Sequence, residues 1–194
     1  MTRSTRTLPP AYFDAVYAAN SDPWRFSSSP YEKKKYAATI AALPKPAYVS
    51  ALEVGCSIGV LTRELAPRCA SLLAVDVAPA PLTAARHRCA DLSNVRFEQM
   101  FVPEQWPVGV FDLILFSEIV YYLSKRDVAG LATKAGLALS PRGNIVLVHW
   151  TGETDYPLGG DEASELFINS IAPAAKVVRQ DGRQLFRIDV LSRG

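Results

Sequence analysis

A glycine-rich turn and a carboxylate farther along the chain are the residues whose types and spacing point most clearly to chemistry. The turn, Leu52–Gly59, reads LEVGCSIG and ends an apolar run. Glycine lets a backbone turn tightly and approach a ligand closely, and small residues between the glycines suit the same crowding. Asp76 ends the next apolar run. In a doubly wound sheet a carboxylate at that point lies beside the turn and accepts hydrogen bonds from ribose hydroxyls, so the pair indicates an adenosine-containing ligand.

Two other nucleotide-binding motifs do not fit these residues. The dinucleotide fingerprint G-x-G-x-x-G requires glycines where this chain has Gly55, Ser57 and Val60. A P-loop requires Gly-Lys-Ser/Thr, which the sequence lacks. A tight strand-to-helix turn without a ligand remains the alternative, because glycines also occur for purely conformational reasons.

The elements that must position these residues alternate between strands and helices, a pattern typical of a parallel α/β sheet. Most of the expected strands are near-continuous apolar runs, as in strands that helices cover on both faces. The expected strands are Val49–Val54, Leu72–Val77, Val95–Glu98, Phe111–Phe116, Ile145–His149, Ala175–Arg179 and Gln184–Leu191. Asp181-Gly182, between the last two, predicts a hairpin turn.

Capping motifs place helices between these strands. Residues 29–32, which read SPYE, form a capping box with proline at the first helical position and predict a helix to about Leu43. Ser124 begins an amphipathic helix by the same logic. Further helices are expected over residues 59–66, 81–90 and 161–172. In the helix that begins with the capping box at residues 29–32, Lys33–Lys35 are expected to lie on a solvated face.

The same residues resemble motifs of the class I methyltransferases that use S-adenosylmethionine (SAM). Glu53-x-Gly55-x-x-x-Gly59 resembles the glycine-rich motif of that family. FDLI at 111–114 resembles its fourth strand, and LSPRG at 139–143 its turn before strand five, with Arg142 replacing a glycine. The resemblance implies an α/β, Rossmann-like fold, with a mostly parallel seven-stranded sheet, helices on both faces and a C-terminal antiparallel hairpin. It also implies SAM as the cofactor of one domain over residues 1–194.

The resemblance also implies roles for individual residues. Glu53 would hold the amino-acid end of SAM, and Asp76 its ribose. Where the family often has an acid for the adenine amino group, Gln99 or a backbone carbonyl would serve, and Met100 or Phe101 would pack against the purine or belong to the core. The residues predicted to bind SAM are Tyr12, Trp24, Tyr31, Glu53, Gly55, Cys56, Ser57, Gly59, Asp76, Val77, Gln99, Met100 and Ser117.

Several segments more narrowly resemble the NodS family of nodulation N-methyltransferases and its wider bacterial relatives. They are YFD at 12–14, DPWRF at 22–26, YEKKKY at 31–36, EVGCSIGVLT at 53–62 and SEIVYYL at 117–123. The resemblance covers roughly residues 11 to 145 and fades beyond residue 149. It implies N-methylation of an amino sugar as one candidate reaction, and it is weakest on the acceptor side.

Polar and aromatic residues just beyond two strand ends are the candidates for the acceptor side. Methyl transfer from a sulfonium to an amine is an in-line displacement that needs alignment and an unprotonated amine. Residues beyond the carboxyl ends of parallel strands face the ligand crevice. Glu118, Tyr121 and His149 are therefore the predicted catalytic residues, with His149 as a base of pKa about 6–7. The alternative is a helix-capping or surface carboxylate for Glu118, a satisfied histidine at a strand end for His149, and a place in the core for either Tyr121 or Tyr122.

Aromatic residues are concentrated in the first part of the chain. Residues 1–43 contain seven of them that could cover a ligand: Tyr12, Phe13, Tyr17, Trp24, Phe26, Tyr31 and Tyr36. They predict an N-terminal helical lid over the cofactor. Packing of the same side chains against the sheet is the alternative.

Composition narrows the classes of function. The chain has 194 residues and a net charge of +2, which gives no electrostatic reason to expect a nucleic-acid partner. No apolar run approaches the ~20 residues needed to cross a bilayer, and the polar N-terminus does not resemble a secretory signal. Three cysteines without a C-x-x-C pair favour a reducing compartment, hence the cytoplasm, over a disulfide framework or a metal site.

The sequence therefore predicts a SAM-dependent methyltransferase acting on the amine of a small molecule or carbohydrate, with an amino sugar on an oligosaccharide as one candidate. An O- or C-methyltransferase acting on another metabolite is the first alternative. A SAM-binding module without catalysis is the second.

Overall fold

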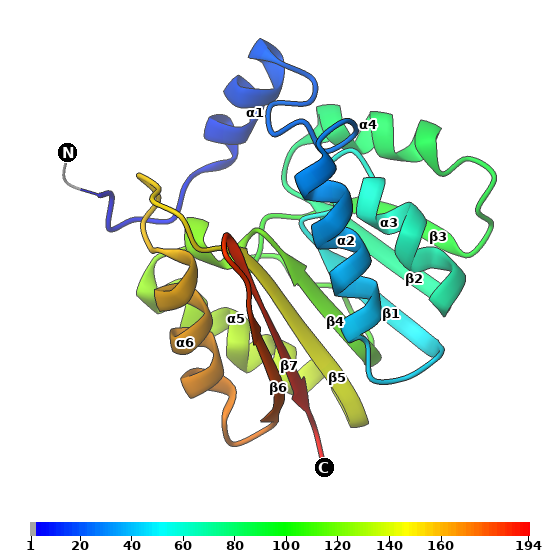
Figure 1. Ribbon diagram of the computed structural model, residues 1–194, viewed down its shortest axis with the longest axis vertical. Coiled ribbons are helices and arrows are strands. Elements are labelled where there is room, and N and C mark those ends of the chain that lie inside the picture. Colours follow the sequence, from blue (N-terminus) through cyan, green and yellow to red (C-terminus); the bar gives the residue numbers. More distant parts are fainter. Residues whose placement is uncertain (1–2) are drawn as a thin grey trace.

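Seven strands pair into one sheet in the computed structural model, which describes residues 3–194 (Figure 1). The strand order is β3-β2-β1-β4-β5-β7-β6. Pairing is parallel from β3 through β5 and antiparallel where β7 joins β5 and β6. The strands are β1 Tyr48–Val54, β2 Cys69–Asp76, β3 Val95–Gln99, β4 Phe111–Ser117, β5 Leu139–Trp150, β6 Lys176–Gly182 and β7 Phe186–Ser192. The predicted fold class, including the C-terminal antiparallel hairpin, is confirmed.

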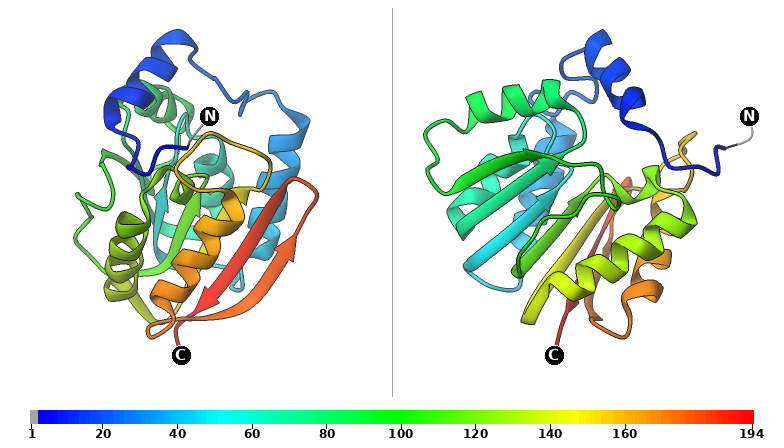
Figure 2. Two further views of the ribbon diagram at one scale, coloured as in Figure 1. Left: turned by 90° about the vertical axis from the view of Figure 1, so that its left-hand side faces the viewer. Right: turned by 180° about the vertical axis from the view of Figure 1, so that it is seen from behind.

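Helices cover both faces of this sheet (Figures 1 and 2). α2, α3 and α4 lie on one face, and α5 and α6 on the other. α1 lies beyond the carboxyl ends of the strands, beside α4 (Figure 1). The helices are α1 Pro10–Ala19, α2 Pro30–Ala42, α3 Val60–Leu65, α4 Pro79–Arg88, α5 Lys125–Ala138 and α6 Gly160–Ile171, with short 3-10 turns η1 Ala66–Arg68 and η2 Val120–Tyr122.

The central strands are buried because both of their faces meet helices. Leu113, Ile114 and Leu115 in β4 are completely inaccessible to solvent. Each buried side chain of this size contributes about 1.5–3 kcal/mol relative to exposure. Two hydrophobic clusters, one on each face of the sheet, therefore hold the carboxyl ends of the strands at fixed positions.

Two elements differ from the sequence prediction. The hairpin turn is not at Asp181-Gly182, because both residues pair with β7 and extend β6. The connection consists of residues 183–185 instead. β5 begins at Leu139, six residues earlier than expected, because Leu139 pairs with Phe111 and the ladder shifts register before continuing. Arg142 takes a left-handed φ of 59° within this irregular stretch.

The serine caps are confirmed, but the solvated lysine face is only partly correct. Ser29 Oγ accepts the backbone N–H of Glu32 at the start of α2. The Glu32 carboxylate does not return to the cap as in a full capping box, because it accepts a hydrogen bond from Lys35 Nζ at 3.1 Å. Lys33 and Lys34 are exposed, whereas Lys35 is only 2% exposed. α2 therefore carries a buried charge toward the sheet.

Within residues 3–194, no helix is both long and apolar enough to cross a membrane.

Candidate active site

A cavity of about 460 Å³ opens at the carboxyl ends of the parallel strands. Its walls come from Gly55 after β1, Asp76 at the end of β2, Glu118 after β4, Trp150 at the end of β5 and Tyr31 in α2. The chain leaves β3 and returns to the sheet on the other side of β1, so the cavity lies at the topological switch point. Ligands bind at this point in open α/β sheets.

Glycine is required at the first position of the turn. Gly55 has a φ of 88°, and a Cβ there would lie 2.1 Å from Ile119 Cγ2 and 2.7 Å from the Ser117 carbonyl oxygen. The turn after β1 therefore packs directly against the segment after β4, with no space for a side chain between them. This contact brings the two predicted halves of the site together.

Asp76 is held at the cavity wall by backbone donors. Its carboxylate accepts the N–H of Ser57 at 2.8 Å and the N–H of Ala78 at 3.0 Å. Burial raises the pKa of Asp76, and these hydrogen bonds act in the opposite direction. A carboxylate has about four lone-pair positions, so acceptor capacity is left over for a ligand hydroxyl. Val77 and Met100 supply apolar surface on the same side of the cavity.

Glu118 organises the opposite end. It takes a left-handed φ of 58° directly after β4. Its Oε2 accepts the Tyr121 hydroxyl at 2.6 Å and the Trp150 backbone N–H at 2.8 Å, and its Oε1 pairs with Lys35 Nζ. Burial acts to raise the pKa of Glu118, but the nearby Lys35 ammonium and His149 and the hydrogen bonds from Lys35 and Tyr121 together outweigh it, so the pKa lies below its usual value. Glu118 is therefore an ionised carboxylate whose two oxygens already have partners.

The cavity lining is acidic and aromatic. Among the described lining residues Lys35 is the only cation, against the carboxylates of Glu32, Asp76, Glu118 and Glu153. Aromatic rings gather at the Glu118 end. Tyr31 and Trp150 have centroids 5.5 Å apart, and Tyr121 stacks on Tyr156 at 5.2 Å. Ring faces and carboxylates both attract cations, so the lining suits positively charged or amine-bearing ligands.

Comparison with known proteins assigns this chain to a family. The family model for nodulation protein S (NodS) matches residues 16–139. The chain belongs to the NodS family. A nodulation protein S from Rhizobium tropici is 33% identical over 132 residues, which are 66% of this chain and 55% of that relative. The chain thus spans little more than half the length of the curated NodS relative.

Two solved structures are similar over most of their length. A Pseudomonas syringae protein assigned as a methyltransferase is 36% identical, with a TM-score of 0.74 over 84% of this chain and 99% of that one. The N-methyltransferase NodS from Bradyrhizobium japonicum WM9, in complex with S-adenosyl-L-homocysteine (SAH), is 22% identical. Its TM-score is 0.81, and the match covers 95% of this chain and 98% of the NodS chain. The NodS structure shares the Rossmann-like fold described above.

The structure brings together ten of the residues predicted for the site of this NodS-family chain. Those that line the cavity are Trp24, Tyr31, Gly55, Ser57, Asp76, Val77, Met100, Ser117, Glu118 and Tyr121. Six predicted residues are not among the described residues that line it: Tyr12, Glu53, Cys56, Gly59, Gln99 and His149.

Four of these six support the turn or its surroundings. Glu53 is completely buried in β1, and burial raises its pKa to about 7. Cys56 is buried, and Gly59 has a φ of 77° and packs against Ala85 of α4. Gln99 donates a hydrogen bond to the Val77 carbonyl at 2.9 Å. Direct contact of these side chains with a ligand in the cavity has no support in this arrangement.

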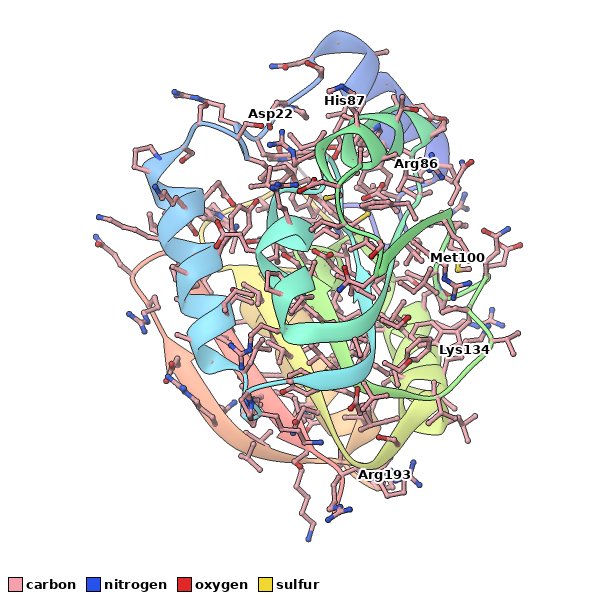
Figure 3. All side chains as sticks on the ribbon, turned by 90° about the vertical axis from the view of Figure 1, so that its right-hand side faces the viewer. Asp22, Arg86, His87, Met100, Lys134 and Arg193 are labelled. Atoms are coloured by element: carbon pink, nitrogen blue, oxygen red, sulfur yellow. The ribbon has the colours of Figure 1, made fainter. Side chains whose placement is uncertain are left out.

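Tyr12 packs edge-on against Phe13, with ring centroids 5.2 Å apart, and lies behind that lining residue. The outward-facing His87 of α4, given no role from the sequence, is exposed (Figure 3).

The prediction of His149 as a base of pKa 6–7 is wrong. The ring is completely buried; its Nε2 accepts the Val120 backbone N–H at 3.2 Å, and its Nδ1 lies 3.1 Å from Ser164 Oγ. Burial lowers its pKa to about 4. α6 and η2 enclose the ring, so His149 fixes the walls of the site and does not reach the cavity.

Glu32 and Lys35, which line the cavity from α2, were not predicted to function there. Tyr17 of α1 was predicted only as a lid residue, and it places its hydroxyl 2.5 Å from Ser57 Oγ in the glycine turn. The i, i+3 spacing of Glu32 and Lys35 was the available sequence indication, because such pairs are neighbours on a helix. Tyr17 lies in the aromatic N-terminal segment, but its partner is far away in the sequence.

His149 is expected to titrate near pH 4, because burial disfavours the imidazolium. The unfolded chain binds this proton near the usual pKa of about 6.5, so the free energy of unfolding should fall as the pH drops from about 6.5 to about 4. Ring ¹H–¹³C NMR spectra would measure the titration. A His87→Asn variant leaves a single imidazole and assigns it. Titration of His149 near pH 6.5 in the folded protein would contradict this burial.

Proposed function

We propose that this protein is a SAM-dependent methyltransferase whose acceptor is the amine of a small molecule or carbohydrate. The observation that carries the proposal is one cavity with two differently built ends. At one end Asp76 is fixed beside a glycine turn, and at the other Glu118 is surrounded by aromatic rings. Membership of the NodS family and the SAH-bound N-methyltransferase NodS neighbour support both the cofactor and the reaction.

The residues present fit SAM. Gly55 and Ser57 of the glycine turn line the cavity, and Asp76 retains acceptor capacity for ribose hydroxyls. Val77, Met100 and Phe101 offer apolar surface for the adenine. The excess of carboxylates in the lining suits a sulfonium cation. When bound, SAM supplies a methyl group on a positively charged sulfur.

The chain contributes alignment and electrostatics and provides no free base. Glu118 is ionised but has partners at both oxygens, and the His149 ring is buried. The acceptor amine must therefore lose its proton to water before attack. The leaving thioether is neutral and needs no acid. Alignment of the amine in the cavity can itself contribute several kcal/mol.

An amino sugar is the acceptor that the NodS resemblance favours. Aromatic faces such as Trp150 and Tyr156 would pack against the apolar faces of sugar rings, and the acidic lining would attract an amine. Loop residues Glu153 and Thr154, in the part of the chain beyond the family match, also line the cavity. These loop residues would adapt the acceptor preference of this chain.

α1 and the segment after it form a lid over the SAM end. The Tyr17 hydroxyl pairs with Ser57, and Trp24 packs on Tyr17 with ring centroids 5.6 Å apart. The predicted lid of residues 1–43 includes Met1 and Thr2, which lie outside the described residues. α2 is a supporting wall and not part of a movable lid, because Lys35 is buried and paired with Glu118 after β4.

Asp76→Asn should weaken SAM binding at least about tenfold, because a charge-assisted hydrogen bond contributes ~1.5–3 kcal/mol. Isothermal titration calorimetry with SAM measures the change. Asp91→Asn is the matched control, since Asp91 is an exposed aspartate paired with Arg63. Unchanged SAM affinity in a folded Asp76→Asn protein would remove Asp76 from the cofactor site.

Amines should be methylated in preference to phenols and carboxylates, with a rate that rises with pH through the ionisation of the acceptor amine. The experiment compares deacetylated chito-oligosaccharides, simple amines, phenols and carboxylates at fixed SAM and measures release of SAH. Turnover of a phenol or carboxylate, with none of any amine, would refute the N-methyltransferase assignment and favour O-methylation.

A further inference from the structure

We propose that Lys35 of α2 is a positioning residue for the acceptor. Lys35 holds Glu118 so that the Tyr121 hydroxyl donates its hydrogen bond to Glu118. The Tyr121 oxygen is then left to accept a hydrogen bond from an N–H of the acceptor amine. This inference rests on the proposed function and adds to it a residue and a rule of selectivity. Acceptors with an N–H are bound productively, and tertiary amines are not.

The first step is the placement of the Lys35 ammonium. Its side chain is 2% exposed and contacts Glu32 on its own helix and Glu118 after β4. It also lies 5.3 Å from the centre of the Tyr31 ring. Burial alone would lower the pKa of Lys35, but the two carboxylates outweigh it and the pKa is raised. Lys35 therefore stays charged and fixes one oxygen of Glu118.

The second step is the orientation of the Tyr121 hydroxyl. Glu118 has no proton to donate, so in the 2.6 Å contact with Oε2 the phenol is the donor. Tyr121 lines the cavity, and its pKa is raised well above the usual value by burial and by the Glu118 charge. Tyr121 therefore remains a neutral phenol, and its single hydroxyl proton is already donated to Glu118. Its oxygen can accept a hydrogen bond from a ligand but cannot donate one.

The third step is the consequence for an acceptor. A neutral primary or secondary amine can donate an N–H to the Tyr121 oxygen and keep its lone pair for the methyl group. A tertiary amine has no N–H to donate, so its nitrogen lone pair would face the lone pair of the Tyr121 oxygen without a hydrogen bond. If Lys35 were neutral, Glu118 would be a buried carboxylate without its cation and would tend to take up a proton. The Tyr121 hydroxyl could then rotate, and the selectivity would be lost.

Several groups other than Lys35 affect the charge of Glu118. From α2 these are Tyr31, Glu32 and Tyr36, from η2 Tyr121 and Tyr122, and from β5 His149. Within this described set Lys35 is the one permanent cation near neutral pH, because burial holds the pKa of His149 at about 4.

The test compares Lys35→Met, Lys35→Arg and Lys34→Met, the last being a control at an exposed lysine of the same helix. Lys35→Met should raise KM for a primary amine about tenfold, the typical effect of losing one hydrogen bond, while calorimetry gives a SAM Kd within about twofold of wild type. Lys35→Arg should retain most of the activity, and Lys34→Met should resemble wild type. A folded Lys35→Met protein with wild-type KM and kcat would overturn the proposal, as would an equal loss of SAM affinity.

Tyr121→Phe decides the question if Lys35→Met does not fold, because it removes only the phenol oxygen. It should raise KM for primary amines and abolish their advantage over matched tertiary amines. Wild-type selectivity in Tyr121→Phe would overturn the proposal. If the wild-type protein methylates amines and these variants behave like it, only this inference fails. If the wild-type protein methylates no amine, the proposed function fails with it.

Discussion

Burial of the Lys35 ammonium costs several kcal/mol, and the two carboxylates that face it offset this cost. The acceptor end of the site depends on this arrangement. Because Glu118 must meet Lys35 with one oxygen, its other oxygen is directed to Tyr121 and Trp150. One carboxylate thereby joins α2, β4, η2 and β5, and it does so from a left-handed backbone conformation. Removing a single partner of such a pair is much more costly than replacing the pair, so the elements are fixed together.

The cofactor end depends on backbone geometry and not on a buried ion pair. Gly55 lets the turn after β1 pass against Ile119, and Ser57 N–H and Ala78 N–H orient Asp76. Ile119 directly follows Glu118, so the glycine turn and the acceptor end share one contact. The distance between the two ends is therefore set by packed backbone, which is what an in-line transfer between two bound molecules requires.

The sequence was sufficient for the fold class and for the position of Asp76 beside the glycine turn, because those depend on local patterns. Apolar runs predicted the strands, and the position of Asp76 at the end of β2 followed from the order of the elements. The acceptor end was less predictable because it depends on contacts between distant segments. Lys35 is one of three consecutive lysines, and its burial against Glu118 distinguishes it from Lys33 and Lys34.

His149 also depends on contacts between distant segments that the sequence does not reveal. Its position at a strand end predicted exposure to the crevice, whereas α6 and η2 close over the ring. No periodicity in the strand could have indicated which of the neighbouring elements would cover it. The sequence thus predicts which polar residues lie near strand ends. Their exposure depends on the elements that pack on them.

The central claim is that one cavity holds SAM at the Asp76 end and leaves the Glu118 end for an acceptor. A crystal structure of this chain with SAH tests it most directly. The account predicts the ribose hydroxyls within hydrogen-bond distance of the Asp76 carboxylate, with Tyr121 still donating to Glu118 and facing unfilled space. SAH bound outside the cavity, or ribose hydroxyls that make no contact with Asp76, would contradict the account.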